Sequence, residues 1–123
     1  MNKAIVTGYI TKDIELRHTK SGKAVCEFNI GVSRDFKNEQ GNYDSDFITI
    51  QLWGNKAETT ASYCKKGDKI GVIGSIRYET YETDAGKRSK TYIFAENVEW
   101  LTPKVNHKEE EQEEESYDDK LPF

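Results

Sequence analysis

The sequence predicts a small all-β barrel with one short helix, and three observations support this fold class. Most of residues 1–101 alternate between apolar and polar side chains, which is the pattern of half-buried strands. One stretch, residues 55–67, instead combines the signals that start and stop a helix. From Thr102 onward the chain loses its periodicity and becomes strongly acidic. The 123 residues therefore suffice for one domain with an appendage.

The first three predicted strands lie at residues 3–10, 24–33 and 46–53. The second of them alternates most clearly, since every other side chain from Ala24 to Val32 is apolar. Long polar connections at residues 11–23 and 35–46 separate these strands. Such connections are typical of a barrel whose loops extend a binding groove.

A helix is predicted next, beginning at Asn55, which is expected to cap it with Glu58 three residues later. Gly67 is expected to end the helix after Lys65 and Lys66, whose charges suit the C-terminal dipole.

Strands resume at residues 69–81 and 89–101, joined by a hairpin loop over residues 84–87. Tyr92 and Trp100, in the last of these strands, are expected in the core or at a subunit seam. Five strands with a helix between the third and fourth follow the order of a five-stranded, partly open Greek-key barrel, the OB-fold. We expect this domain over residues 1–103. Low hydrophobicity and high charge predict a disordered acidic tail over residues 104–123.

The net charge of −4 conceals two unlike parts. Residues 1–104 carry 16 basic and 14 acidic side chains, whereas residues 105–123 carry 2 and 8. A nearly neutral body with an acidic tether remains compatible with an anionic partner. The N-terminal MNKAIVTGYI lacks the features of a signal peptide, and no apolar run is long enough to span a membrane. Cys26 and Cys64 are expected to be reduced thiols, so we expect a cytoplasmic protein without a cofactor or metal.

Two aromatic side chains fall on the polar face of the third predicted strand. Ile48, Ile50 and Leu52 share its core face, whereas Phe47 and Trp53 share the other. The same alternation places Tyr81 on the polar face of the fourth predicted strand. Phe36 is expected in a loop between Arg34 and Lys37.

Exposed aromatics interleaved with cations are what a single-strand nucleic-acid binder needs, because bases stack on flat rings while cations contact phosphates. The candidate phosphate contacts are Lys3, Arg17, Lys23, Arg34, Lys37, Lys56, Arg77, Lys87, Arg88 and Lys90. The residues alone leave a second interpretation open, in which these aromatics form a dimer seam or contact a second sheet layer.

The chain resembles the bacterial and phage single-stranded DNA-binding protein family. The resemblance is carried by VTGYITKDIELRHTKSGKAVCEFNIGVSRDFKN, DFITIQLWGNKAE, SYCKKGDKIGVIGSIRYETYETDAGKR and the terminal DDKLPF. It implies an OB-fold homotetramer that wraps single-stranded DNA during replication, recombination and repair. The base-stacking side chains that it implies are Phe36, Phe47, Trp53 and Tyr81. Relatives often carry Trp at two of these positions, and a Tyr is common where this chain has His18.

The family resemblance also implies that the C-terminal tip recruits replication, recombination and repair proteins. A ring and an α-carboxylate on one terminal residue suit a pocket with an apolar floor and a basic rim. The tip residues are Asp118, Asp119, Leu121, Pro122 and Phe123. Lys120 stands where relatives commonly have an acid, and the short tether resembles phage- or plasmid-borne versions.

An enzyme is the rival class, and the sequence favours it little. His18 and His107 lie far apart, and no catalytic Ser/His/Asp or Cys/His set is visible. Asp44 and Asp46 suit a metal nuclease, but a solvated loop explains them better. No residue distinguishes DNA from RNA as the ligand, because stacking does not detect the 2′-hydroxyl.

Overall fold

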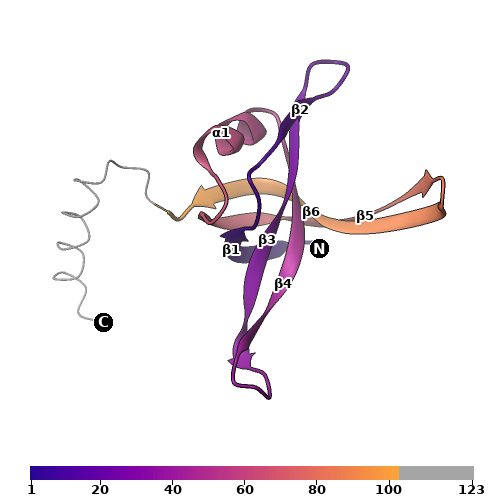
Figure 1. The fold of residues 1–123 in the computed structure, drawn as a ribbon. Helices are drawn as coiled ribbons and strands as arrows, with labels where there is room; N and C mark the ends of the chain where they lie inside the picture. Colours follow the sequence, from indigo (N-terminus) through magenta and orange to yellow (C-terminus); the bar gives the residue numbers. More distant parts are fainter. Residues whose placement is uncertain (103–123) are drawn as a thin grey trace, which may run out of the picture.

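The computed structural model describes residues 1–102 (Figure 1). Within that range the chain forms one helix, α1 (Asn55–Tyr63), and the strands β1 (Ala4–Ile10), β2 (Leu16–His18), β3 (Ala24–Lys37), β4 (Tyr43–Trp53), β5 (Lys69–Thr83) and β6 (Gly86–Trp100). The sheet order is β1-β5-β6-β4-β3-β2, and a further pairing of β1 with β3 closes the five long strands into a barrel. The predicted OB-fold is confirmed; the three-residue β2 is an addition in the first long connection.

Close backbone contacts complete the barrel at two glycines. A Cβ on Gly8 would lie 2.5 Å from the carbonyl oxygen of Gly31, so β1 and β3 approach each other too closely for any side chain there. A Cβ on Gly74 would lie 2.2 Å from the carbonyl oxygen of Phe94. The β5–β6 register shifts at this point, and Glu96 is skipped in the pairing. Such a bulge bends and twists the strand that carries it.

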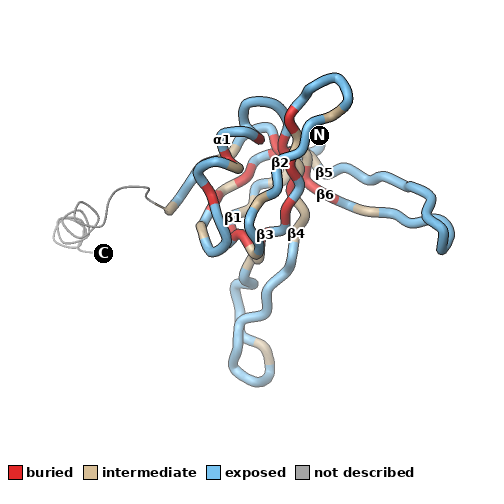
Figure 2. The backbone as a smooth tube through the Cα atoms, turned by 45° about the horizontal axis from the view of Figure 1, so that its top comes forward, coloured by how far each residue is buried: buried red, intermediate tan, exposed pale blue. Residues whose placement is uncertain are grey.

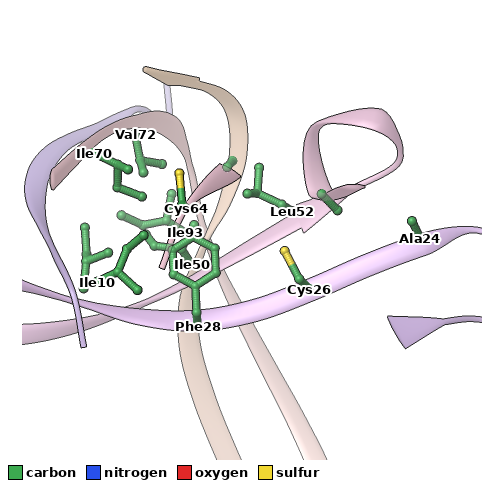
Figure 3. Close-up of a cluster of buried hydrophobic side chains, with 13 residues drawn as sticks. Ile10, Ala24, Cys26, Phe28, Ile50, Leu52, Cys64, Ile70, Val72 and Ile93 are labelled. Atoms are coloured by element: carbon green, nitrogen blue, oxygen red, sulfur yellow. The ribbon is translucent and has the colours of Figure 1, made fainter. Parts of the chain in front are cut away.

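The interior is filled by aliphatic side chains from every long strand (Figure 3). Ile30, Ile50, Leu52 and Ile70 have no exposed surface. Burying an Ile or Leu side chain fully contributes about 1.5–3 kcal/mol, so these positions dominate barrel stability. The predicted alternation along β3 is confirmed, because Ala24, Cys26, Phe28 and Ile30 are all buried.

Two hairpins project beyond this core in different directions (Figures 1 and 2). We call residues 33–46 the β3–β4 arm and residues 76–91 the β5–β6 arm. Nearly every arm position is exposed, whereas the buried positions gather where the strands converge (Figure 2). The expectation that Phe36 lies in a loop is wrong, because strand pairing continues as far as Lys37 opposite Tyr43.

The helix differs from its predicted capping. Gly54, not Asn55, occupies the N-cap, with a φ of 69° and no side-chain cap hydrogen bond. Its N–H donates to the carbonyl oxygen of Ala24 at 2.8 Å, which ties the start of α1 to the start of β3. The helix ends at Tyr63, so Lys65 and Lys66 lie beyond it. Within residues 1–102, no helix has the length and apolar character to cross a membrane.

Candidate nucleic-acid interface

Phe47 and Trp53 both lie on the outer face of β4. Phe47 is 70% exposed and Trp53 is 37% exposed. Ile50 and Leu52, on the opposite face of the same strand, have no exposed surface, which confirms the predicted parity. At about 3.3 Å per residue, the two aromatic positions stand roughly 20 Å apart along the strand.

Phe47 lies across the backbone of β3. It pairs with Gly31, and a Cβ added at Gly31 would lie 3.5 Å from Cε1 of the Phe47 ring. The ring therefore lies over the backbone of β3 at Gly31, where an added Cβ would be in ordinary van der Waals contact with it. Because most of Phe47 remains exposed, the ring still offers surface to a ligand.

Trp53 is held by a chain of hydrogen bonds across three strands. Its Nε1–H donates to Oε1 of Gln51 at 2.8 Å, and Gln51 Nε2 donates to Oε2 of Glu27 at 3.3 Å. Glu27 in turn accepts from Lys90 Nζ at 2.9 Å. These contacts fix the orientation of the indole on the face of the barrel.

Gln51 and Glu27 were not among the sequence-predicted site residues. Gln51 shares the outer face of β4 with Trp53, two residues away, and this spacing is visible in the sequence. Glu27 is brought opposite Gln51 only by the β3–β4 register, which the sequence does not reveal.

The other two predicted stacking residues lie on separate arms. Phe36 is 73% exposed near the end of the β3–β4 arm, and Tyr81 is 47% exposed on the β5–β6 arm. Tyr81 pairs with Arg88 across its hairpin. The structure therefore places Phe47 and Trp53 on one face of the barrel, and it places Phe36 and Tyr81 on projections from that barrel.

Four of the ten predicted phosphate-binding side chains are already paired with carboxylates. The pairs, with their N···O distances, are Lys3–Glu96 at 2.9 Å, Arg17–Glu15 at 3.9 Å, Arg34–Asp46 at 2.9 Å and Lys90–Glu27 at 2.9 Å. A phosphate must compete with these carboxylates. Part of the near-neutral charge of residues 1–104 therefore comes from ion pairs that include candidate DNA contacts.

The Arg34–Asp46 pair is bidentate and closes the base of the β3–β4 arm. Arg34 Nε donates to Asp46 Oδ2 at 3.1 Å, and Nη2 donates to Oδ1 at 2.9 Å. This hydrogen bonding lowers the pKa of Asp46 and raises the pKa of Arg34. Asp44 accepts a hydrogen bond from Asn38 Nδ2 at 3.0 Å. Both aspartates considered for a nuclease therefore have structural partners, and no metal-binding cluster of three His, Cys, Asp or Glu side chains occurs within residues 1–102.

The remaining cations fall into distinct groups. Lys23 lies beside Trp53, and Lys37 lies 5.9 Å from the ring centroid of Tyr43 on the β3–β4 arm. Arg77, Lys87 and Arg88 belong to the β5–β6 arm. Lys56 Nζ donates to the backbone oxygen of Glu96, whose carboxylate binds Lys3. Lys3 and Lys56 thus gather at Glu96.

Two further aromatic predictions have different outcomes. Tyr92 is 4% exposed and buried as expected, with its hydroxyl 2.5 Å from Oε1 of Glu79. Trp100 was expected in the core or at a subunit seam, but 40% of it is exposed, so it is not a core residue. It stacks on Tyr63 with ring centroids 5.1 Å apart, where the end of β6 meets α1.

The predicted partner-binding tip lies outside the described residues. This applies to Asp118, Asp119, Leu121, Pro122 and Phe123, and to the whole tail from residue 104.

Comparison with known proteins identifies relatives along most of the chain. The model of the single-strand binding protein family matches residues 1–101. Single-stranded DNA-binding protein 2 of Listeria innocua is 43% identical over 110 residues, which cover 89% of this chain and 69% of that protein. Single-stranded DNA-binding protein B of Bacillus subtilis is 38% identical over 108 residues, which cover 87% of this chain and 96% of that protein.

A solved structure agrees with the fold. The crystal structure of a deletion mutant of the single-stranded DNA binding protein from Thermus aquaticus superposes with a TM-score of 0.70 at 26% identity. The match covers 85% of this chain and 52% of that chain, so this chain spans about half the length of the deletion mutant.

Proposed function

Because the chain belongs to the single-strand binding protein family, we propose that it holds single-stranded DNA by stacking bases on aromatic side chains and contacting phosphates with Lys and Arg. Phe47 and Trp53 on the barrel, with Phe36 and Tyr81 on the arms, are the proposed stacking platforms. The family consists of non-enzymatic DNA-binding proteins, so the proposed role is to cover and protect DNA during replication, recombination and repair.

The exposed rings on the outer face of β4 are the observation that carries this proposal. An aromatic side chain on the solvent face of a strand needs a partner to cover it, and a nucleobase has a flat face of the same kind. Stacking is worth about 1–3 kcal/mol per base and is tolerant of sequence. Several platforms together thus give useful affinity to a body of almost neutral charge.

Tryptophan fluorescence tests the proposal directly. A dT oligomer is expected to quench most of the emission, because Trp53 stacks on a base while Trp100 packs on Tyr63. Trp53→Phe should remove most of the quenching, and the control Trp100→Phe should retain it. Quenching of equal depth in Trp53→Phe would exclude Trp53 as the reporter platform.

We also propose that the chain assembles into a homotetramer through a different surface. Ile5 on β1 is 73% exposed and pairs with Ile73 on β5, which is 37% exposed. Tyr9 and Leu101 add further exposed apolar area, at 52% and 43%. An apolar surface of this kind suits contact with a second copy and leaves the β4 aromatics available for DNA.

Native mass spectrometry with and without a long dT oligomer tests assembly and ligand class together. A tetramer mass that gains one oligomer is expected, and Ile5→Glu should lower the assembly state. A monomer mass for the unaltered chain would refute the assembly proposal and leave the stacking proposal standing.

We further propose that the tip, with Asp118, Asp119, Leu121, Pro122 and Phe123, recruits replication, recombination and repair proteins. The acidic tail also competes with DNA for the cationic side chains. Removing residues 105–123 is expected to tighten single-strand binding at low salt and to abolish capture of such partners. Unchanged capture by the truncated chain would refute the recruitment proposal.

A further inference from the structure

An open hollow of about 510 Å³ lies against Trp53. Lys23, Trp53, Gly54 and Phe94 line it, so its walls come from the residue before β3, the end of β4, the N-cap of α1 and the middle of β6. Two contacts hold these segments together. The N–H of Gly54 donates to the carbonyl oxygen of Ala24, and Gln51 pairs with Phe94. Hollows of this size are within the range that proteins use for small organic groups.

Gly54 keeps one side of the hollow clear. Its φ is +69°, a conformation that side chains disfavour, and no atom lies within 4 Å of the position that a Cβ would occupy. A ligand can therefore approach the backbone between Trp53 and the helix.

Phe94 lies on the outer side of β6, between the buried residues Ile93 and Ala95. The guanidinium carbon of Arg77, on the neighbouring strand β5, lies 4.4 Å from the centroid of the Phe94 ring. Arg77 does not line the hollow, which Phe94 shares with Trp53. A cation over an aromatic face is held electrostatically, so Arg77 steadies the Phe94 ring.

We propose that this hollow takes one nucleobase of the bound strand, stacked on Phe94 beside Trp53, with Lys23 and Arg77 placed for the adjacent phosphates. Phe94 is then a fifth stacking platform, in addition to the four that the family resemblance implies. This inference rests on the proposed function, since it extends the same DNA-binding face by one position.

The chemistry of the hollow favours a nucleobase over other occupants. Trp53 is already a proposed platform, so a strand stacked on it passes the mouth of the hollow. The aromatic walls match the flat faces of a base, and cations flank them as phosphates require. Within residues 1–102, the Lys23 ammonium has no carboxylate partner, in contrast to Lys90 on the same face.

Two substitutions at Phe94 separate stacking from simple apolar burial. Phe94→Leu keeps an apolar side chain but removes the flat face, and it should weaken binding of a dT oligomer about tenfold. Phe94→Tyr keeps the ring and should bind within about twofold of the unaltered chain. Tyr63→Leu is the matched control, because it removes an exposed ring outside the hollow and should leave affinity unchanged.

Photocrosslinking reports contact with DNA directly, so a loss of protein stability does not give the same result. A dT oligomer containing 5-bromodeoxyuridine, irradiated on the full-length protein, should give adducts at both Trp53 and Phe94 by mass spectrometry. Unfolding midpoints of the variants show that each one remains folded.

Three results would overturn the inference. In the first, Phe94→Leu binds the dT oligomer as tightly as the unaltered chain. In the second, irradiation gives no adduct at Phe94. In the third, Phe94→Leu differs from the unaltered chain in assembly mass when no DNA is present. The last result would assign the hollow to a second copy of the chain. If Trp53→Leu weakens binding while Phe94→Leu does not, the proposed function stands and only this inference fails.

Discussion

The barrel and its two arms are made from the same strands, but they hold aromatic side chains in different ways. On the barrel, Trp53 is fixed by a hydrogen bond to Gln51, and Phe47 rests over Gly31 above a closely packed interior. On the arms, Phe36 and Tyr81 stand on two-stranded hairpins that have no core beneath them. Isolated hairpins are marginally stable in water, so we expect the arm rings to become more ordered when a ligand holds them. The proposed stacking rings on the barrel are therefore preorganised, and the proposed rings on the arms are expected to adjust to a ligand.

The close packing of the barrel is tested most severely at Gly74. Gly74→Ala places a Cβ against the backbone of Phe94 and Ala95, at 2.2 and 2.9 Å, and should destabilise the protein by about 3 kcal/mol. Gly71→Ala is the control on the same strand, since the nearest atoms to its Cβ lie at 3.7 Å. Urea unfolding measures both variants, and equal stability of the two would show that the strands separate easily.

The difference in preorganisation predicts unequal losses of DNA affinity. Trp53→Leu should weaken binding of a dT oligomer more than tenfold, because a ring that is already fixed loses little conformational entropy when a base stacks on it. Tyr81→Leu should weaken binding of the same oligomer about threefold, because the entropy lost in ordering the arm offsets part of the stacking free energy at Tyr81. Fluorescence anisotropy of a labelled oligomer measures both effects. Losses of equal size would contradict the distinction between barrel and arm.

The carboxylates that pair with candidate DNA contacts offer a finer comparison. Glu27→Gln on the barrel and Asp46→Asn on the arm each release one cation, Lys90 or Arg34. Each freed cation that reaches a phosphate should steepen the slope of log affinity against log salt by about 0.7. Glu15→Gln is a control with a longer ion pair, 3.9 Å to Arg17. Slopes that do not change would mean that these cations do not contact phosphate.

The pH dependence of stability gives a further test, and it belongs to the barrel. Burial raises the pKa of the Cys26 thiol to about 11, from an ordinary value of about 9. The unfolded chain therefore ionises first as the pH rises, and the stability due to the neutral thiol is lost between about pH 9 and 11.

Urea unfolding at the two ends of this window measures the loss. Cys26→Ala lacks the thiol and should show a flatter dependence on pH, although its cavity lowers stability at every pH. An equally steep dependence in Cys26→Ala would assign the effect to other groups. Tyr92 is one such group, because its hydrogen bond to Glu79 raises its pKa.

Local alternation was sufficient to predict the barrel and its principal aromatic face. The burial of Ile50 and Leu52 and the exposure of Phe47 and Trp53 follow from a period of two along one strand. Family resemblance added Phe36, whose neighbours do not alternate clearly. The length of the arms was not predicted, because strand pairing beyond the core depends on cross-strand contacts such as Arg34–Asp46.

Features that depend on register could not be read from the sequence. The bulge opposite Gly74 shifts the parity of β6, so the outward position of Phe94 and the exposed position of Trp100 follow only from the folded structure. The pairing of Glu27 with Lys90, 63 residues apart in the chain, similarly requires three strands in register. Four cations that the sequence predicts as phosphate contacts are therefore already paired with carboxylates in the structure.

The hydrogen bond from the Trp53 indole to Gln51 also bears on how widely the protein can bind. Hydrogen bonds to base edges are the means by which proteins tell one nucleotide from another. The only polar hydrogen of this ring is already donated to the protein, so it cannot be offered to guanine or thymine oxygens. On the proposed DNA-binding face, Trp53 is therefore expected to stack on each base without distinguishing it, which suits the coating role proposed above.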